Sequence, residues 1–305
     1  MQDFLFMAGK KAFLSVVFDW IWRVLQHLLP SKPYLRLKYR VVFKRRLDLE
    51  NPETFNEKLQ WLKLYGCRPE YSGMVDKVEA KRYLAELVGP EYVIPSVGVW
   101  KNPEDIDFES LPQKFVLKCN HDSGHVIICT DKSELDIPAV RRELGSMLKN
   151  NYYLMGRETP YKDVPRRIIA EEYLEDCTSG ELKDYKVHNF NGEPKLILLC
   201  QDRFSEGGLT EDFYTADWEH LDVQRPDHPN SRVPDARPEE LDELIRLSRI
   251  LSKDIPFLRT DFYIINHKVY VGELTFFPSS GFARFVPDEW DYTFGEWLEL
   301  PSKSS

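Results

Sequence analysis

"RTDFYIINHKVYVGELTFFPSSGF", residues 259–282, has the composition of two strands joined by a short turn. Both runs are rich in β-branched and aromatic residues, and Asn266-His267 separates them. Each run also contains one carboxylate, Asp261 in the first and Glu273 in the second. A hairpin that turns near Asn266-His267 makes these acids near neighbours across the ladder, in an otherwise apolar setting.

This pair of acids indicates a bound cation, because two like charges that face each other in apolar surroundings repel. Carboxylate oxygens suit Mg²⁺, which proteins hold through a few carboxylates together with the phosphates of a substrate. Arg259, two residues before Asp261, adds a planar set of donors for a phosphate or a carboxylate. The alternative is an acidic hairpin that faces solvent.

A second hairpin is predicted in "KFVLKCNHDSGHVIIC", residues 114–129. Its first strand contains Lys118, and a buried strand rarely carries an ammonium group without an anion to meet it. The loop that follows holds residues whose backbone N–H groups can approach a phosphate: Asn120, Asp122, Ser123 and Gly124. A lysine on a solvated strand edge is the alternative, and the single glycine matches neither of the common phosphate-loop motifs.

The remaining patterns predict an α+β chain in which helices separate the hairpins. Helices are expected at residues 51–65, with Thr54 as N-cap and Glu57 in the capping-box position, and at 74–89, 138–150 and 238–255. A strand and turn are expected at 92–100, a strand at 166–174, and a hairpin at 184–204 that turns at Asn191-Gly192. The strands are too few and too often hairpin-linked for a doubly wound parallel sheet.

Composition and charge set further bounds on the protein. The five cysteines are odd in number and form no C-x-x-C pair, which favours reduced thiols in the cytosol over a disulfide framework or a zinc site. The net charge is −9, but residues 1–46 hold ten Lys or Arg against two Asp and so carry +8, leaving −17 for the rest. A basic front on an acidic body suggests an anionic surface or polymer as a neighbour.

The apolar run at residues 12–29 predicts an amphipathic helix that ends at Pro30. Its polar residues recur every four positions, and ionisable groups within the run are costly in a bilayer core, so a spanning helix is not expected. No small-residue cleavage site ends the run, which argues against a secretory signal. Two interpretations stay open, docking on protein or attachment to a membrane surface; Trp20, Trp22 and the basic run 36–46 favour the second.

Together these patterns resemble the ATP-grasp superfamily, and within it the TupA-like branch named for teichuronopeptide synthesis. The resemblance rests on "VDKVEAKRYLAELVG", "YVIPSVGVW", "KFVLKCNHDSGHVIIC", "IIAEEYLED", "GELKDYKVHNFNGEPK" and the opening hairpin, and it runs from about residue 50 to 300. It implies two α+β lobes that grip ATP, with the amphipathic helix in front. The expected divisions are an N-terminal segment at 1–48, a catalytic region at 49–300 with a lid lobe at about 110–172 and a metal-binding lobe at about 173–300, and a tail at 301–305.

The resemblance also implies roles for individual residues. Lys77 and Lys118 would bind the α- and β-phosphates, residues 120–124 would cover the triphosphate, and Glu171 with Tyr173 and Leu174 would recognise adenine. Asp184 would face the ribose, while Asp261, Glu273 and Thr275 would hold Mg²⁺ and Arg259 would act with Lys118 on the transferred phosphoryl group. Thr275 departs from the Asn that is common at the third metal position. Substrate contacts are expected from Lys186, His188, Arg203, Ser279, Ser280 and Gly281.

The implied function is an ATP-dependent carboxylate–amine ligase that uses ATP and Mg²⁺ and proceeds through an acyl phosphate. The expected substrates are a uronic acid of a surface polysaccharide, of capsule, O-antigen or teichuronopeptide type, which could be lipid-linked, and an amino acid. The expected location is the cytoplasm, with the inner membrane surface as a further partner and no role for nucleic acid. Two alternatives remain: a glycosyltransferase of the same pathway, for which "DID" at 105–107 offers a D-x-D spelling, and a non-catalytic scaffold at the membrane.

Overall fold

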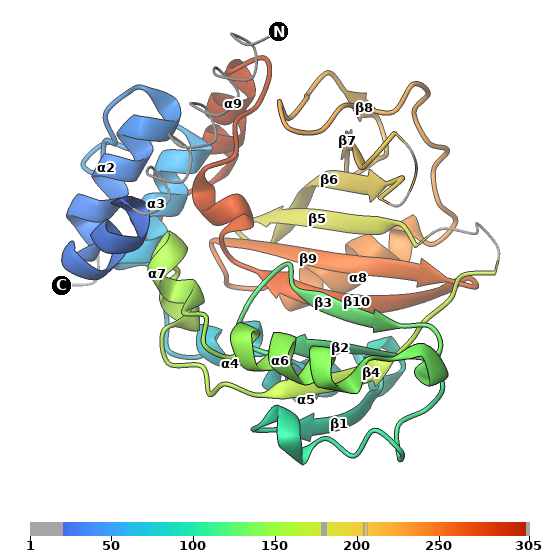
Figure 1. Ribbon diagram of the computed structural model, residues 1–305. Coiled ribbons are helices and arrows are strands. Elements are labelled where there is room, and N and C mark those ends of the chain that lie inside the picture. The colour runs from blue at the N-terminus through green and yellow to red at the C-terminus, as the bar shows by residue number, and fades with distance from the viewer. Residues whose placement is uncertain (1–20, 178–181, 204, 206, 303–305) are drawn as a thin grey trace, which may run out of the picture.

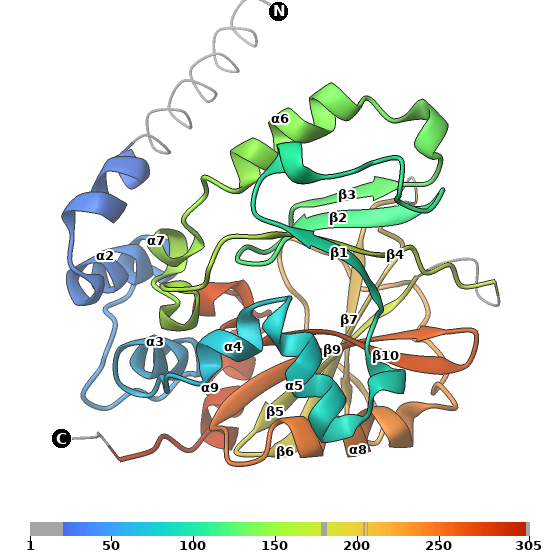
Figure 2. The ribbon, with the colours of Figure 1, turned by 90° about the horizontal axis from the view of Figure 1, so that it is seen from below.

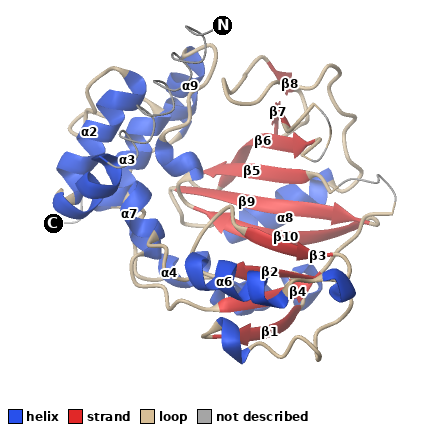
Figure 3. Cartoon of the chain, in the orientation of Figure 1, coloured by secondary structure: helices blue, strands red, loops and turns tan. Residues whose placement is uncertain are grey.

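Two antiparallel sheets and the helices around them make up the fold in the computed structural model, which describes residues 21–177, 182–203, 205 and 207–302 (Figures 1 and 3). The predicted α+β class is therefore confirmed. Residues 1–20 of the predicted amphipathic helix lie outside the described residues, and residues 21–28 are helical. Within the described residues, the helices all lack the combination of length and hydropathy needed to cross a bilayer.

The larger sheet has six strands in the order β10-β9-β5-β6-β7-β8. Their bounds are β5 Asp184–Phe190, β6 Glu193–Gln201, β7 Thr210–Thr215, β8 His220–Leu221, β9 Phe257–Ile265 and β10 Lys268–Thr275. The two hairpins predicted for these strands are present, and residues with positive φ form their turns: Asn191 and Gly192 in one, Asn266 and His267 in the other. Left-handed turn residues of this kind match the natural twist of a two-residue hairpin.

The smaller sheet has four strands in the order β1-β4-β2-β3, with β1 at Ser96–Trp100, β2 at Phe115–Cys119, β3 at Val126–Cys129 and β4 at Ile168–Glu172. It has its own apolar core, to which α6 (Ile137–Met147) contributes Val140, Leu144 and Met147. Figure 2 shows α6 on the face of this sheet that points away from the larger sheet. Because β1 belongs to this sheet, the smaller lobe begins near residue 96, earlier than the expected start at about 110.

Helices cover one face of the larger sheet and one of its ends. Helix α8 (Leu241–Leu251) packs on β5, β6 and β9, where Ser248 Oγ donates to Asn189 Oδ1 at 2.8 Å. Helices α2 (Ser31–Phe43), α3 (Phe55–Tyr65) and α9 (Glu289–Trp297) gather at the end of the sheet where β5 and β6 turn (Figure 1). The remaining short elements are α7 (Tyr152–Gly156) and the 3₁₀ turns Pro90–Tyr92, Pro103–Asp105, Lys132–Glu134, Thr159–Tyr161 and Pro278–Gly281.

The predicted helix at 51–65 forms with its predicted cap. Thr54 Oγ1 accepts a hydrogen bond from the backbone N–H of Glu57, and the Glu57 carboxylate accepts one from the backbone N–H of Thr54. This reciprocal capping box satisfies two donors that the first helical turn otherwise leaves unpaired. The sequence therefore specified this helix start locally.

The prediction of one continuous helix at 74–89 is wrong. Two helices take its place, α4 at Tyr71–Val75 and α5 at Glu79–Val88, and Asp76 between them is extended with φ −71° and ψ 109°. Tertiary hydrogen bonds hold this break, since the Lys77 N–H donates to the carbonyl of Asn120 and the Asp76 carboxylate accepts from the Asn120 amide. The break turns Lys77 away from the helix and toward the loop after β2.

Candidate active site

The two acids of the last hairpin are paired neighbours, as the sequence predicted. Glu273 on β10 lies opposite Asp261 on β9 in the antiparallel register, next to a bulge between Val271 and Glu273. Alternation along β9 puts Asp261 on the face opposite α8, because the neighbouring Thr260 hydrogen-bonds to Ser248 of that helix. Asp261 is only 3% exposed, whereas about a quarter of the Glu273 side chain remains accessible.

Asp261 is held by two cations. Arg259 donates from Nε to Oδ1 and from Nη2 to Oδ2, both at 2.6 Å, and Lys186 Nζ on β5 lies 2.8 Å from Oδ2. Burial acts to raise the pKa of Asp261, but Arg259 and Lys186 outweigh it and hold that pKa below the ordinary range. The carboxylate is therefore ionised at neutral pH.

The metal residues predicted for this hairpin offer oxygen donors of the kind that Mg²⁺ prefers. Asp261 and Glu273 supply carboxylates, and the Thr275 hydroxyl, which accepts from Arg259 Nη2 at 3.2 Å, supplies a weaker oxygen. Among them the Glu273 carboxylate is the most accessible, with Lys77 Nζ 3.9 Å from its Oε1. These residues thus fit a Mg²⁺ ion that approaches from the side of Glu273.

On the smaller sheet, Lys118 forms an ion pair with Glu171, which is the kind of anionic partner that a lysine on a buried strand needs. Its Nζ lies 2.5 Å from Glu171 Oε2, and Lys81 Nζ lies 2.7 Å from Glu171 Oε1. Burial opposes ionisation of Glu171, but the two lysines lower its pKa below the ordinary value. Alternation puts Lys118 and Glu171 on the face opposite α6, which is the face toward the larger sheet.

Lys81 is a residue that the sequence interpretation missed. It lies on α5, whereas Lys77 lies in the break before that helix, so helical spacing from Lys77 does not identify it. Together Lys81 and Lys118 place two ammonium groups around one buried carboxylate. Two cations against a single acid leave a net positive charge, which suits a phosphate.

The loop after β2 is shaped by buried polar contacts. Asn120 is fully buried, and its amide donates to Asp76 Oδ1 and to the carbonyl of Pro165 while it accepts from the N–H of Arg167. These bonds use the Asn120 side chain, so it positions the loop. Lys77 Nζ donates to the backbone carbonyl of Asp122 at 2.5 Å.

The tip of this loop keeps groups that a ligand could use. Asp122 is 2% exposed, burial raises its pKa, and its Oδ2 lies 3.5 Å from Nδ1 of the exposed His125. Gly124 is exposed with φ +90°, and the space where a Cβ would stand is open. Hydrogen bonds of Asn120 therefore hold the start of the predicted phosphate loop in place, and the loop is open at Gly124.

The predicted nucleoside residues lie along the end of β4 and on β5. Tyr173 and Leu174 follow β4 and are half-buried, with Lys114 Nζ 5.5 Å from the centre of the Tyr173 ring. Asp184 on β5 accepts from Arg203 Nη2 at 2.8 Å and lies 3.3 Å from Lys186 Nζ. Lys186 and Arg203 were both predicted to contact substrate. In the structure they form ion pairs with acids of the candidate site.

His188 lies behind these groups. Its ring is 5% exposed, and burial together with Arg259 lowers its pKa to about 3, so it is neutral at physiological pH. Its Nδ1 lies 3.1 Å from the backbone carbonyl of Lys186. A neutral, enclosed ring of this kind supports the sheet and is poorly placed to contact a substrate.

The predicted substrate loop at 279–281 is strained and tightly held. Ser279, Ser280 and Gly281 have φ of 48°, 53° and 60°, a left-handed conformation that non-glycine residues seldom adopt. Lys63 Nζ donates to the carbonyls of Ser280 and Gly156, and Ser280 Oγ donates to Glu158. Lys63 and Glu158 are buried and were missed, because their neighbours are distant in sequence.

The sequence of residues 57–299 matches the model of a protein family described as TupA-like ATPgrasp. The chain belongs to this family. No protein with a curated description matches it. The TupA-like ATP-grasp match covers both sheets and every residue of the site described above, so the predicted fold is confirmed.

Solved ATP-grasp ligases resemble this TupA-like chain only distantly. D-alanine–D-alanine ligase from Bacillus anthracis, solved with ATP, is 19% identical with a TM-score of 0.37, and the match covers 66% of this chain and 53% of that one. The ATP-grasp ligase PsnB, solved with a minimal precursor, Mg and ADP, is 14% identical with a TM-score of 0.40. That match covers 72% of this chain and 57% of PsnB. D-alanine–D-alanine ligase from Helicobacter pylori is 14% identical with a TM-score of 0.41, and the match covers 74% of this chain and 61% of that one. The chain thus spans little more than half of the first of these structures.

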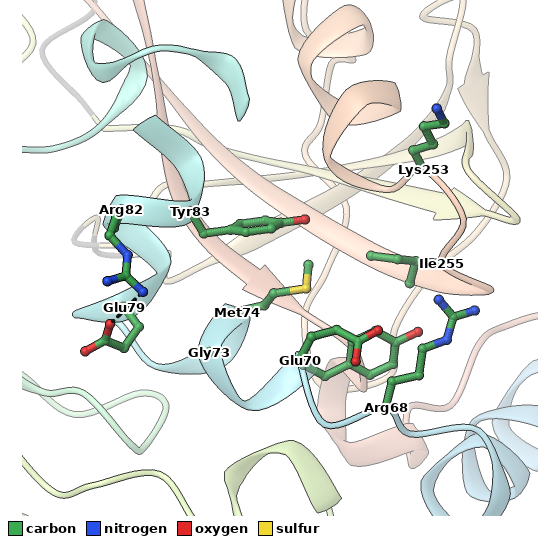
Figure 4. A pocket seen from close by; sticks show the side chains of 10 residues that line it. Arg68, Glu70, Gly73, Met74, Glu79, Arg82, Tyr83, Lys253 and Ile255 are labelled. Atoms are coloured by element: carbon green, nitrogen blue, oxygen red, sulfur yellow. Dashed lines mark ion pairs between the residues drawn. The ribbon is translucent and has the colours of Figure 1, made fainter. Parts of the chain in front are cut away.

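A separate pocket of about 260 Å³ lies behind α4 and α5 (Figure 4). Arg68, Arg82 and Lys253 surround it, and Met74 and Tyr83 line its interior. Within the described chain, its lining shares no residue with the predicted TupA-like site.

Proposed function

We propose that this chain is an ATP-dependent carboxylate–amine ligase. The observation that carries the proposal is the position of Lys77, whose ammonium contacts the phosphate loop at Asp122 and lies 3.9 Å from Glu273 on the larger sheet. This residue joins the phosphate-binding candidates of one sheet to the metal-binding candidates of the other. A triphosphate with its Mg²⁺ needs both sets of groups within reach of one another.

The chain's own cations would bind and orient the nucleotide. Lys77, Lys81 and Lys118 supply positive charge for the phosphates, and the open tip of the loop at 122–124 would cover them. Arg259 would hold the transferred phosphoryl group, since its guanidinium already lies beside Asp261 and Thr275. Glu273 would hold the Mg²⁺ that accompanies the nucleotide, which would supply charge stabilisation at the phosphates.

The reaction needs no side-chain nucleophile. A carboxylate oxygen of the substrate would attack the γ-phosphorus of ATP, and the bond to the β-phosphate oxygen would break with release of ADP. The amine nitrogen would then attack the carbonyl carbon of the acyl phosphate, lose a proton and expel inorganic phosphate. The protein contributes mainly position and charge stabilisation, which are the usual sources of catalysis in phosphoryl transfer.

For the substrates, we propose a uronic acid of a surface polysaccharide as the carboxylate and an amino acid as the amine. Support comes from the TupA-like family match and from the basic N-terminal region, which suits an anionic glycan or the membrane that carries it. The loop at 279–281 follows the metal strand directly and would contact one substrate. Location in the cytoplasm at the inner membrane surface belongs to the same proposal.

The alternative, a glycosyltransferase, has little structural support. Asp105 and Asp107 of the D-x-D spelling are exposed and accept local hydrogen bonds from Asn102 and Glu109. An exposed loop whose acids accept hydrogen bonds from nearby residues is a poor nucleotide-sugar site.

One incubation separates the two functions. The purified chain is mixed with ATP, Mg²⁺, UDP-sugars, a panel of uronic acids and a panel of amino acids. The ligase predicts release of ADP that requires both a uronic acid and an amine. Release of UDP would favour the transferase, and release of neither nucleotide would contradict both.

A further inference from the structure

The acids of the candidate metal centre are already bonded to protein cations. Both oxygens of Asp261 accept from Arg259, and Oδ2 also lies 2.8 Å from Lys186 Nζ. The Thr275 hydroxyl accepts from the same guanidinium at 3.2 Å. Two of the three predicted metal ligands therefore have their oxygens directed at nitrogen donors.

Lys186 occupies this position because of strand register. It lies on β5 directly opposite Asp261 on the neighbouring β9, and its side chain is 15% exposed. Its ammonium lies 3.3 Å from Asp184 and 2.8 Å from Asp261. The Lys186 ammonium therefore lies between two carboxylates. In that position it offsets the negative charge that a divalent ion would otherwise offset.

The charge balance of the centre points the same way. The three acids Asp184, Asp261 and Glu273 face four cations, each within 3.9 Å of at least one of the acids: Lys77, Lys186, Arg203 and Arg259. A two-metal centre clamps both oxygens of a displacement and needs acids in excess to hold two divalent ions. This centre has no such excess.

We propose that the centre binds a single Mg²⁺ through Glu273, and that the Lys186 ammonium takes the place beside Asp261 of a second ion. The inference rests on the proposed function, because it concerns the metal that accompanies ATP. It assigns Lys186 to the metal centre, although the sequence had indicated a contact with substrate. Glu273 remains the carboxylate that is open to the ion and its phosphates.

Counting bound Mn²⁺ tests this proposal without measuring turnover. Electron paramagnetic resonance with a non-hydrolysable ATP analogue at saturation gives the number of ions per chain. The wild-type chain should bind one ion. Lys186→Gln should bind two, because Asp261 loses a cation, and Lys186→Arg should still bind one. Lys132→Gln, which removes a half-buried lysine bonded to backbone carbonyls in the smaller lobe, is the matched control and should bind one.

The outcomes separate the inference from the function on which it rests. Two ions in the wild-type chain, or one ion in folded Lys186→Gln, would overturn the role of Lys186 and leave the ligase proposal standing. No nucleotide-dependent binding of Mn²⁺ in any variant would instead overturn the proposed metal-dependent function. Thermal melts confirm folding, and if Lys186→Gln is unfolded, Lys186→Met with a similar stem is counted in its place.

Discussion

Lys118 Nζ lies 2.5 Å from Glu171 Oε2, in an ion pair that joins β2 to β4 on the face toward the larger sheet. The Lys118 side chain is 15% exposed and that of Glu171 is 7% exposed. Removing one member of a buried pair ordinarily costs about 3–5 kcal/mol, because the other charge is left unpaired. Here Lys81 remains beside Glu171, so the loss of stability should be smaller.

Lys118→Met should therefore weaken nucleotide binding more than it weakens the fold. We expect the dissociation constant of an ATP analogue to rise at least tenfold, about 1.4 kcal/mol, while the melting temperature falls by a few degrees. Calorimetric titration and a thermal melt measure the two effects. An unchanged affinity with a large loss of stability would show that Lys118 is structural only.

Glu273→Gln should leave the fold intact and abolish Mg²⁺-dependent turnover of ATP. The accessible carboxylate loses the charge that holds the ion, which should cost several kcal/mol at the phosphoryl group and lower the rate at least a hundredfold. Release of ADP and circular dichroism are the measurements. Glu193→Gln, which removes an exposed acid paired with Arg249, is the control and should turn over normally. Wild-type turnover in Glu273→Gln would refute the metal assignment.

The buried His188 should make the fold sensitive to mild acid. Its folded pKa of about 3 lies below the ordinary 6.5, so below pH 6.5 the unfolded chain binds a proton that the folded chain does not. Burial of the neutral His188 therefore costs no stability above pH 6.5. The free energy of unfolding decreases as the pH falls from 6.5 toward 3. At pH 4 the loss should be about 3 kcal/mol.

Urea unfolding at pH 7 and pH 4 checks this expectation. His188→Asn should show a smaller difference between the two pH values than the wild type. His267→Gln is the control, since His267 is exposed and its hydrogen bond with Glu240 raises its pKa. An equal difference in wild type and His188→Asn would exclude His188 as the cause.

Exposed basic residues on α2 and at its C-cap should govern attachment to anionic membranes. Arg36, Arg40 and Lys44 recur every four residues and are exposed, while Tyr34, Leu35 and Tyr39 are buried. Each basic residue is worth about 1 kcal/mol at an anionic surface, so changing all three to Gln should weaken vesicle binding about a hundredfold without lowering the melting temperature.

Co-sedimentation with vesicles that contain an anionic lipid measures this effect. The control changes the exposed Lys101, Arg142 and Lys149 of the smaller lobe to Gln, which removes the same charge elsewhere. Residues 21–29 also pack on protein, because Arg157 donates to the carbonyls of Gln26 and Leu29. If the intact chain ignores vesicles at low salt, the helical segment serves packing alone.

Sequence patterns predicted the local parts of this fold well. The turn at Asn266-His267 was predicted correctly, and Thr54 with Glu57 specified a helix start. The turn by itself would pair Asp261 with Gly272, and a bulge between Val271 and Glu273 brings Glu273 opposite Asp261. Periodicity could not show the break after Val75, because hydrogen bonds to Asn120, more than forty residues away, maintain it. For the same reason the sequence placed Asp261 near a metal but missed its pairing with Lys186 from another strand.

The transfer of a carboxylate oxygen to phosphate tests the ligase account most directly. A uronic acid labelled with oxygen-18 in its carboxylate is incubated with ATP, Mg²⁺, an amino acid and the wild-type chain, and the released phosphate is analysed by mass spectrometry. Reaction through an acyl phosphate predicts one labelled oxygen in each inorganic phosphate that is formed together with the amide. Amide formation with unlabelled phosphate would contradict the account.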